Sequence, residues 1–478
     1  MRQYEFYCRV GRVHRDRPFL LMTTIMKFGG TSVADVAALK NVAAIVGSFR
    51  QSRPVVVVSA MSGVTDSLVT STIIASQGQV AEAIKSLEST FARHKSTAKE
   101  GLSPELAEAF AVEVDQAANT IAGLLKLSAE YPSLRQELYD AIVSWGEMLS
   151  SKLLALILFE AGVNSQQVDA RDCIVTDDNY TCALPLMPDT FVRTRAKVLP
   201  VLDQGAIPVL GGFIGATSDG RTTTLGRGGS DYSAAIIGAA LRVDEIQIWT
   251  DVTGVLTADP RVVPEAHTVE RLSYAEAAEL AYFGAKVLHP KTIQPAIEDS
   301  IPVRICNSRA ADESGTVVCA QTITSPRTIK AIAHKSGVTT VQVTSARMLG
   351  AYGFLRALFE VFDRHRTVVD VVTTSEVSVS LSLDDASSLP SIISELETLG
   401  TVRIDQGQAI ICVVGEGLKE MSGIAAKIFN AISDIPVSLI SQGASSINFT
   451  FAVAEEQVHE AVGRLHHEFF REQAVSAA

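Results

Sequence analysis

The sequence has no paired cysteines and little positive charge. Its six cysteines are scattered over 478 residues, without a CxxC pair and without the histidine spacing of a metal cage. We therefore expect no disulfide framework and no metal held by the protein itself, and a reduced, cytoplasmic compartment is the simplest location. The formal net charge of -12 argues against nucleic-acid and membrane-surface binding, because both require a positive field. Any anion must therefore be bound by local groups.

Long apolar runs are also missing. No run approaches the ~20 residues that cross a bilayer, so we expect no membrane partner. Residues 1–22 contain five arginines together with Glu5 and Asp16, and they lack the apolar centre of a signal peptide. We interpret this segment as an extension outside the fold. A targeting segment is the alternative, and it would make a plastid location possible.

The rest of the chain is long enough for about three folding units at ~150 residues per domain. Over residues 23–310, β-branched strands alternate with alanine-rich helical stretches, which predicts an α/β domain with a largely parallel sheet sandwiched by helices. Ligands bind such sheets at the carboxyl ends of the strands. We expect strands at residues 23–28, 54–60, 206–215, 245–250 and 302–307, and helices over residues 80–160 with interruptions near Gly101 and at Tyr131-Pro132.

Beyond about residue 330 the sequence contains two copies of a smaller unit. Residues 367–384 align without a gap on the segment that begins at residue 435, at an offset of 68, which matches Leu381 with Phe449. Each copy follows a glycine-initiated amphipathic helix and precedes a second helix. This pattern predicts two ferredoxin-like βαββαβ domains, over residues 335–405 and 406–475. Repeated small domains of this kind favour a sensor over a catalyst.

The first chemical motif, MKFGGTS at residues 26–32, follows a strand and leads into a helix. Gly29 and Gly30 let the backbone approach a phosphate, the helix start offers N–H groups, and Lys27 adds a positive charge. The sequence contains neither GxxxxGKS nor GxxxxGKT, so this is not the usual P-loop. A tight turn with a solvated lysine is the alternative.

A second strand end carries SAMSGVTD at residues 59–66. Ser59 and Thr65 can hydrogen-bond a small polar ligand, whereas the alternative is that Thr65 and Asp66 cap the next helix. Further on, Glu147 in SWGEMLSS has apolar helical neighbours. A carboxylate there needs a ligand or, as the alternative, a salt bridge.

The most specific motif is TTTLGRGGSDYSA at residues 222–234. Three glycines surround Arg227, and Ser230 and Asp231 open a helix. Arg227 can bind a carboxylate through two parallel hydrogen bonds. The alternative is a surface ion pair between Arg227 and Asp231 on a flexible loop.

Two later segments fit a nucleotide. In WTDVTGVLTADPR, Thr250 and Asp251 stand at the carboxyl end of a strand, and the turn at Asp259-Pro260 aims Arg261. The alternative for this segment is an ordinary strand-to-turn connection without a binding role. In FGAKVLHP, Lys286 follows the end of a helix and can reach a phosphate, or it only complements the helix dipole.

Together these segments resemble the aspartate kinase family, with an amino acid kinase fold followed by ACT domains. KFGGTSV, GRGGSDY, FGAKVLHP and TTSEVSVSL stand here in the family's order and spacing. The resemblance implies that MgATP phosphorylates the side-chain carboxylate of L-aspartate, giving 4-phospho-L-aspartate, the first step toward lysine, threonine and methionine. No segment resembles homoserine dehydrogenase, so we expect a monofunctional form.

The resemblance also implies roles for individual residues. The nucleophile is a carboxylate with a pKa of about 4, so no general base is required, and we expect Asp231 to organise the site. Mg²⁺ is expected to arrive with ATP. Leu256 stands where some relatives carry a tyrosine near the nucleotide, which leaves the adenine partner open. The implied residues are Lys27 and Asp231 for catalysis; Ser59, Thr65, Glu147, Arg227 and Ser230 for aspartate; and Lys27, Phe28, Gly29, Gly30, Thr250, Asp251, Arg261, Lys286 and Val287 for ATP.

For the ACT domains the resemblance implies an amino-acid effector, with lysine the expectation. Gly350 and Ala351 replace side-chain donors of bacterial lysine-sensitive relatives and match the plant type, which leaves the effector's identity open. We expect a homodimer or higher homo-oligomer formed through the ACT domains, and ordinary strand ends in that interface are the alternative to an effector site. The implied effector residues are Met348, Gly353, Phe354, Leu355, Asp370, Thr374, Ser375 and Glu376.

Two other functions fit parts of this pattern. A kinase of the same fold could act on glutamate, acetylglutamate or a nucleotide, but the ACT pair and the combination of Arg227 with Glu147 favour aspartate. A catalytically inactive amino-acid sensor could keep the fold. The presence of Lys27, Asp231 and Lys286 favours an active enzyme.

Overall fold

The computed structural model describes residues 22–284, 288, 290–320, 329–350, 352–443 and 445–471. The chain forms two compact units, one of residues 1–226 and 237–246 and the other of residues 227–236 and 247–478. It passes between them after Gly226, again within helix α9 (Gly229–Leu241) and a third time within strand β8 (Glu245–Thr250). The extension expected over residues 1–22 lies outside the described residues, apart from Met22, and stays a prediction.

The first unit is built on a parallel sheet. Its strands lie in the order β3 (Ser165–Val168), β5 (Ile207–Gly211), β2 (Pro54–Val58) and β1 (Thr24–Phe28). Each neighbouring pair is parallel, as the sequence predicts, and every residue of β2 is buried because both faces of the sheet are covered. The register puts Phe28 beside Val58 and Val58 beside Gly211, so three strands end in one row.

The single strand expected over residues 206–215 is two strands. The chain leaves β5 at Gly211, turns at Phe213 with a φ of 67°, and continues as β6 (Ile214–Thr217) in a separate sheet. That sheet has the order β4 (Val175–Thr176), β6 and β7 (Thr222–Thr224), with β6 antiparallel to β7.

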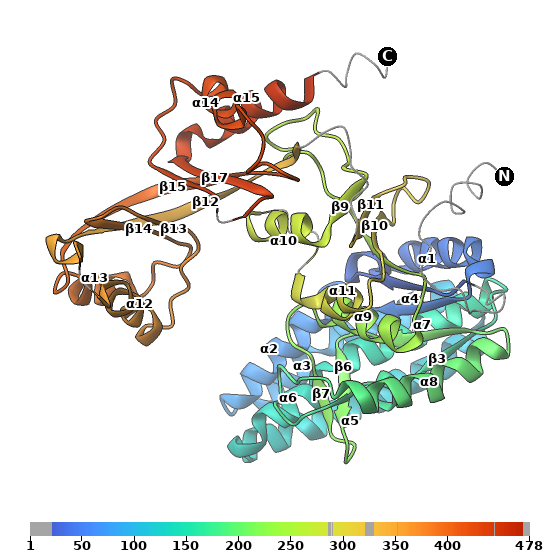
Figure 1. Cartoon of the computed structure of the whole chain (residues 1–478). Helices are drawn as coiled ribbons and strands as arrows, with labels where there is room; N and C mark the ends of the chain where they lie inside the picture. Colours follow the sequence, from blue (N-terminus) through green and yellow to red (C-terminus); the bar gives the residue numbers. More distant parts are fainter. Residues whose placement is uncertain are drawn as a thin grey trace. The chain divides into compact units, whose positions relative to one another are not determined.

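The helices of the first unit follow the expected pattern. The interruptions near Gly101 and at Tyr131-Pro132 are confirmed, and further breaks occur at Leu87 and Ser144. Helix α7 packs against β3 and β5 (Figure 1). The helices are α1 (Val36–Ser48), α2 (Val64–Ser76), α3 (Val80–Ser86), α4 (Glu88–Gly101), α5 (Pro104–Glu130), α6 (Arg135–Val143), α7 (Trp145–Glu160) and α8 (Met187–Asp203).

One helical stretch corrects the expectation that the chain has no membrane-length apolar segment. Pro132–Glu160 has the length and the apolar composition of a membrane-crossing helix, with a mean hydropathy of 1.5 in its best window. Within the protein, 72% of that window is buried. The apolar residues are thus those of core helices α6 and α7, which face both the sheet and neighbouring helices.

The second unit begins with a smaller set of strands. Strand β10 (Val303–Asn307) is antiparallel to β11 (Thr316–Cys319), which is parallel to β9 (Arg271–Ser273). Helix α10 (Tyr274–Tyr282) starts with a reciprocal cap between Ser273 and Glu276 and is followed by α11 (Gln294–Glu298).

The rest of the second unit is one antiparallel sheet with the order β13, β14, β12, β15, β17, β16. Strands β12 and β15 pair from Ile329 with Gly415 to Thr344 with Thr401 and so run through both repeats. The second repeat therefore takes its fourth strand from the first half of β12. The strands are β12 (Ile329–Thr344), β13 (Val372–Thr374), β14 (Ser378–Leu383), β15 (Thr401–Gly415), β16 (Leu439–Gln442) and β17 (Asn448–Ala454).

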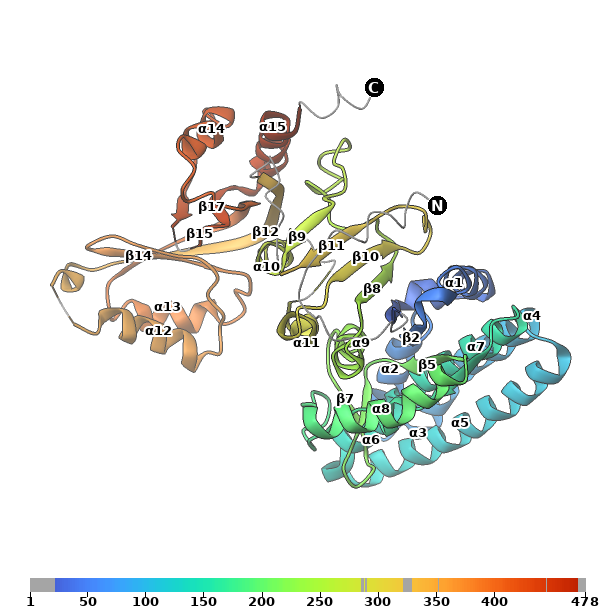
Figure 2. The same cartoon turned by 45° about the vertical axis from the view of Figure 1, so that its right-hand side comes forward.

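Each repeat has its own pair of helices and its own core (Figure 2). The glycine-initiated helices are confirmed, because Gly353 and Gly423 stand at the helix starts with φ near 80°. Leu381 and Phe449, matched by the repeat, are both buried. The helices are α12 (Phe354–Arg364), α13 (Leu389–Leu396), α14 (Ile424–Ala431) and α15 (Val458–Phe470).

Candidate active site

In the first unit, the loops after β1 and β2 lie against each other. The Ser59 N–H donates to the Phe28 carbonyl at 3.1 Å, and the Ser62 N–H donates to the Gly30 carbonyl at 3.2 Å. A Cβ atom on Gly30 would lie 2.9 Å from the Ala60 carbonyl oxygen, so only glycine permits this approach. The structure thus brings the MKFGGTS and SAMSGVTD motifs together at the carboxyl ends of adjacent parallel strands.

Glu147 stands in the first turn of α7 beside this edge. Its Oε1 accepts a hydrogen bond from the Ala60 N–H at 3.1 Å, and a Cβ on Gly211 would lie 3.0 Å from Glu147 Cβ. The residue is 3% exposed, and its Oε2 has no hydrogen-bond partner in the described part of the chain. Burial raises the pKa of Glu147 to about 8, while the Ala60 hydrogen bond and the positive charge of Lys27 act in the opposite direction. A buried carboxyl with one open oxygen is a ready acceptor for a cationic group.

Two hydroxyl residues, Ser59 and Thr65, stand in the segment that connects β2 to α2. Ser59 is half-buried, and its carbonyl accepts a hydrogen bond from Ser150 Oγ of α7 at 2.8 Å. Thr65 is half-buried in the first turn of α2, which starts at Gly63 without a side-chain cap. Neither Thr65 nor Asp66 is the capping residue of α2, so the structure does not show the capping alternative.

In the second unit, Arg227, Ser230 and Asp231 occupy one turn at the start of α9. Gly228 has a φ of 75°, and a Cβ there would lie 2.6 Å from Thr292 Cγ2. The Asp231 N–H donates to the Gly228 carbonyl at 3.1 Å, and Arg227 is exposed. A cation and a helix start with polarised N–H groups can together hold an anion.

The end of β8 carries the next expected residues. The Thr250 carbonyl accepts hydrogen bonds from the Ser308 N–H at 2.7 Å and from Ser308 Oγ at 3.0 Å, so the strand end is fixed. Thr250 Oγ1 donates to Asp251 Oδ1 at 3.2 Å, and Asp251 is exposed. The hydroxyl and carboxylate pair suits a ribose or another polyhydroxyl group.

Arg261 differs from its predicted orientation. Its guanidinium folds back on Asp259, with Nη2 at 2.6 Å from Oδ2, because the Asp259 carboxylate also accepts the Arg261 N–H at 2.9 Å. Arginine beside Asp259 lowers the pKa of that carboxyl. The Arg261 side chain is 88% exposed, so solvent weakens the pair. Lys286 and Val287, the last expected nucleotide residues, lie outside the described residues.

The carboxylate of Asp370, an expected effector residue, contacts two side chains that the sequence did not indicate as its partners. The Tyr282 hydroxyl at the end of α10 donates to Asp370, and Lys335 Nζ of β12 lies 3.6 Å from it while also pairing with Asp384. The Asp370 side chain is 3% exposed. Burial, followed by the neighbouring Asp384, raises its pKa to about 6, against the opposing effects of Tyr282 and Lys335.

The remaining expected effector residues surround the start of α12 and the turn after β13. Met348 and Phe354 are partly buried against the core of the first repeat. Gly353 forms the start of α12, and Leu355 is 42% exposed. In the turn, Ser375 and Ser378 share a hydrogen bond between their hydroxyls at 2.7 Å, and the exposed residues are Thr374, Ser375 and Glu376.

Among the residues that the structure describes, no group of three or more histidine, cysteine, aspartate or glutamate side chains could hold a metal ion.

Comparison with known proteins identifies the family. Residues 22–307 match the amino acid kinase family model, and residues 411–469 match an ACT domain model. Lysine-sensitive aspartokinase 3 of Escherichia coli is 37% identical over 460 residues, which cover 93% of this chain and 99% of that protein. This chain belongs to the aspartokinases, within the amino acid kinase family.

Other aspartokinases agree with this placement. The chloroplastic aspartokinase 1 of Arabidopsis thaliana is 37% identical over 466 residues, covering 94% of this chain and 80% of the relative. Two solved structures of E. coli aspartokinase III are 36% identical and cover 94% of this aspartokinase. The complex with aspartate and ADP has a TM-score of 0.76 over 100% of its chain, and the complex with lysine and aspartate has 0.80 over 99%.

Proposed function

We propose that this aspartokinase transfers the γ-phosphoryl group of ATP to the side-chain carboxylate of L-aspartate, and that lysine regulates it through the ACT domains. An oxygen of the aspartate carboxylate forms a bond to the γ-phosphorus while the bond from that phosphorus to the bridging oxygen of ATP breaks. The products are 4-phospho-L-aspartate and ADP. The attacking carboxylate is already ionised at neutral pH, so positioning and charge neutralisation carry the catalysis.

The buried Glu147 carboxyl is the observation that carries this proposal. Its open Oε2 atom lies in a 3% exposed residue at the strand edge that also holds Lys27 and Ser59. Ionised Glu147 would accept the α-ammonium of aspartate, with Ser59 and Thr65 as further hydrogen-bond partners. Arg227 and Ser230 would hold the α-carboxylate. A neutral ligand could not offset the cost of ionising this buried carboxyl.

Lys27 is proposed to act at the transferring phosphoryl group. It follows Met26 on β1 and precedes the Gly29-Gly30 turn, whose backbone can approach a phosphate closely. Mg²⁺ carried by ATP supplies further charge neutralisation when bound. Asp231 is proposed to organise Lys27 or the substrate ammonium, since no proton has to be removed.

The choice of acceptor can be tested directly. Release of ADP is measured with aspartate, glutamate and N-acetylglutamate at equal concentrations. We expect turnover with aspartate alone, because a longer side chain would misplace the reacting carboxylate relative to Glu147 and Lys27. Activity with glutamate and none with aspartate would overturn the proposed reaction.

The nucleotide is proposed to bind through Thr250, Asp251 and Arg261, with Phe28 and the backbone of Gly29 and Gly30 at the phosphates. Lys286 and Val287, which lie outside the described residues, would complete this part of the site. Arg261 would exchange its exposed pair with Asp259 for a phosphate, which costs little because such pairs contribute ~0–1 kcal/mol.

Replacing Arg261 with alanine is expected to raise the KM for ATP about threefold to tenfold, as the loss of one exposed charge-assisted hydrogen bond would. The KM for aspartate and the Tm should stay unchanged, because Arg261 is bonded only locally to Asp259. Steady-state kinetics with ATP as the varied substrate provide the measurement. Arg403→Ala is the matched control, since Arg403 pairs with Asp405 two residues away. Equal KM values for ATP in both variants would contradict the role of Arg261.

The effector site is proposed to centre on Asp370, which would accept an ammonium group of lysine. Met348, Gly353, Phe354 and Leu355 would contact the aliphatic part, and the turn of Thr374, Ser375 and Glu376 would cover it. Tyr282 and Lys335 both contact the Asp370 carboxylate in the structure. An effector amine would therefore displace these two groups.

Tyr282→Phe is expected to strengthen inhibition by lysine about threefold to tenfold at pH 7.5, because the effector no longer competes with the tyrosine hydroxyl for Asp370. The wild-type half-inhibitory concentration should also rise as the pH falls below about 6, where Asp370 becomes protonated. Inhibition curves from pH 5.5 to 8 measure both effects, with Tyr131→Phe, an exposed tyrosine at the end of α5, as control. Unchanged inhibition in Tyr282→Phe would contradict the displacement.

Assembly through the ACT domains is proposed from the apolar side chains that they expose. Val368, Val372 and Val377 near β13 and Ile440 on β16 are 37–71% exposed. Burying these residues between subunits would form a homodimer or a higher homo-oligomer. We place the enzyme in the cytoplasm, or in a plastid if residues 1–22 act as a targeting segment, as in the relative named chloroplastic.

A further inference from the structure

A second buried carboxylate, Asp140 near the end of α6, has no role in the proposed reaction. Asp140 is fully buried, and its two oxygens accept three hydrogen bonds. The donors are the Thr181 N–H at 2.9 Å, the Thr224 N–H at 2.9 Å and Thr224 Oγ1 at 2.7 Å. A carboxylate buried this completely and bonded to two distant segments fixes those segments relative to each other.

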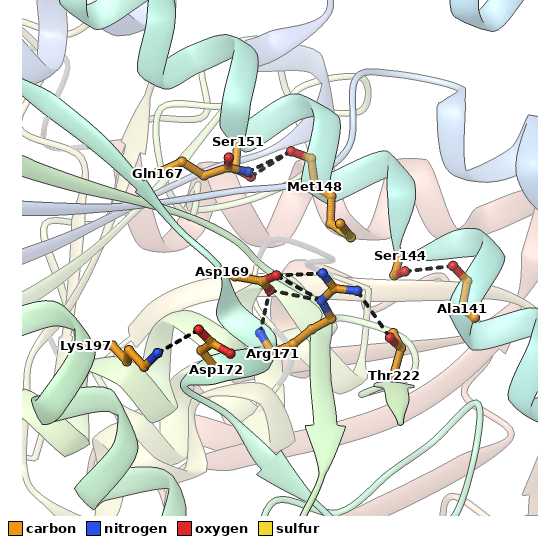
Figure 3. A network of polar contacts seen from close by, with 10 residues as sticks. All are labelled: Ala141, Ser144, Met148, Ser151, Gln167, Asp169, Arg171, Asp172, Lys197 and Thr222. Carbon is orange, nitrogen blue, oxygen red and sulfur yellow. Dashed lines mark hydrogen bonds and ion pairs between the residues drawn. The ribbon is translucent and has the colours of Figure 1, made fainter. Parts of the chain in front are cut away.

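One of the two segments is β7, the strand of three consecutive threonines. Each threonine hydroxyl has a partner from a different part of the first unit. Thr222 Oγ1 lies 3.4 Å from an Arg171 nitrogen, at the edge of the pair that Arg171 forms with Asp169 (Figure 3). The Thr223 hydroxyl bonds to Thr176 Oγ1 at 2.7 Å. Thr224, the last of the three, is held by the Asp140 carboxylate, to which it donates two hydrogen bonds, one from its N–H and one from its hydroxyl.

The other segment contains Thr181 and Cys182, and it lies directly against Gly226. Gly226 has a φ of 75°, and a Cβ added there would lie 3.3 Å from both the Thr181 carbonyl oxygen and Cys182 Sγ. The Ala183 N–H also donates to the Thr224 carbonyl at 2.9 Å. Asp140 therefore bonds to Thr224, two residues before Gly226, and to Thr181, which packs on Gly226.

These contacts hold the backbone that leads into the GRGGSDY motif at residues 226–232. The next residue in the chain is Arg227, and the Leu225 N–H is bonded to the Phe213 carbonyl at 2.9 Å. The backbone from Thr224 to Gly226 is thus held through the N–H and carbonyl of Thr224, through the N–H of Leu225 and by the close packing of Thr181 and Cys182 on Gly226. The left-handed conformation of Gly226 then sets the backbone direction at Arg227, the next residue.

We propose that Asp140 is a positioning residue for aspartate binding: its buried carboxylate fixes Thr224 and Thr181, and through them the backbone from which Arg227 departs. The inference rests on the proposed role of Arg227 in holding the substrate carboxylate. Loosening this backbone weakens aspartate binding selectively. We expect ATP binding to be unaffected, because within the described part of the chain the hydrogen bonds to the Asp140 carboxylate come from Thr181 and Thr224, and neither is a proposed nucleotide residue.

Asp140→Asn is the first test, because the amide keeps the shape but turns one acceptor into a donor facing other donors. We expect the KM for aspartate to rise about tenfold or more, with the KM for ATP within about twofold of wild type, as the loss of a buried charge-assisted bond predicts. Asp178→Asn is the matched control, because Asp178 is an exposed aspartate in the loop that contains Thr181, and this variant should bind aspartate normally.

Thr224→Val is the second test, and it covers the case in which Asp140→Asn fails to fold. It removes only the hydroxyl donor to Asp140 and should raise the KM for aspartate about threefold, whereas Thr224→Ser restores the hydroxyl and should return it to wild type. A lower Tm with an unchanged KM for aspartate in both Asp140→Asn and Thr224→Val would overturn the proposal, because a merely structural carboxylate predicts that result.

Arg227→Ala separates this proposal from the one on which it rests. If Arg227→Ala raises the KM for aspartate and the Asp140 and Thr224 variants do not, the positioning role is wrong and the role of Arg227 stands. If Arg227→Ala leaves the KM for aspartate unchanged, Arg227 does not hold the substrate, and the positioning role is overturned together with it.

Discussion

Lys27→Ala is expected to lower kcat by about 10²–10³-fold, the usual cost of removing one group that stabilises charge developing in the transition state. The aspartate carboxylate and the ATP phosphates repel each other inside a protein of net charge -12, so a cation between them is essential. Lys27 stands on β1, near the row of strand ends, and its positive charge acts on Glu147 of helix α7. The KM for aspartate should change less than kcat, because the loss falls mainly on the transition state.

Lys40→Ala is the matched control, since Lys40 is an exposed lysine on the helix that follows the same motif. Its kcat should equal the wild-type value. Lysine binding by Lys27→Ala, measured calorimetrically, should also be unchanged, which would show that the variant is folded. Full turnover by Lys27→Ala would remove Lys27 from the mechanism and reopen the reading of the chain as an inactive sensor.

The dissociation constant for aspartate is expected to fall roughly tenfold per pH unit as the pH rises toward about 8, and to level off above it. The sign follows from burial, which raises the pKa of Glu147 and so keeps it protonated in the free protein at neutral pH. The substrate ammonium pairs with the ionised form, and binding must therefore release a proton. Calorimetry between pH 6.5 and 8.5, in buffers of different ionisation enthalpy, measures both the affinity and the proton.

Glu147→Gln should weaken aspartate binding about 30-fold or more, as expected when one partner of a buried charge pair is removed. It should also abolish the pH dependence and the proton release. Glu130→Gln, an exposed glutamate at the end of α5, is the control and should retain both. A pH dependence that survives in Glu147→Gln would assign the titration to another group.

Within the second unit, strand β12 links the proposed effector residue Asp370 to the segment between Asp251 and Arg261. The strand carries Lys335 beside Asp370, and its earlier residue Ile332 donates from its N–H to the Thr257 carbonyl at 2.8 Å. Helix α10 ends at Tyr282, which bonds to Asp370, and its Glu279 accepts a hydrogen bond from Asn448 of β17 at 2.7 Å. Strand β12 therefore connects Asp370 to a segment flanked by residues proposed to hold ATP, and α10 connects Asp370 to the second repeat.

Much of the fold could be predicted from local sequence patterns. Strand β8 matches the expected residues 245–250, and the helix breaks at Gly101 and Tyr131 occur where glycine and proline indicate them. The break between β5 and β6 could not be predicted, because it depends on Phe213 in a left-handed conformation that bulky residues rarely adopt.

The candidate site was predictable where strand ends define it. Lys27 and Ser59 lie at the same edge because β1 and β2 are parallel and end in one row, and the motifs follow those strands. Glu147 reaches this edge from helix α7, where it accepts a hydrogen bond from the Ala60 N–H. No comparable sequence pattern indicated which side chains from distant segments would become partners. The fold-back of Arg261 on Asp259 and the Tyr282 bond to Asp370 depend on rotamers and tertiary contacts. Asp140 had one weak signal, a carboxylate among apolar helical neighbours, as Glu147 had.

An aspartate-dependent kinase assay, titrated with lysine and in parallel with threonine and S-adenosylmethionine, tests the central claim most directly. The purified full chain is incubated with MgATP and aspartate, and the acyl phosphate is trapped with hydroxylamine as ADP release is followed. We predict one aspartyl hydroxamate per ADP and a progressive loss of both with lysine. ADP release that does not depend on aspartate, or aspartate turnover that none of the three effectors changes, would contradict a regulated aspartokinase.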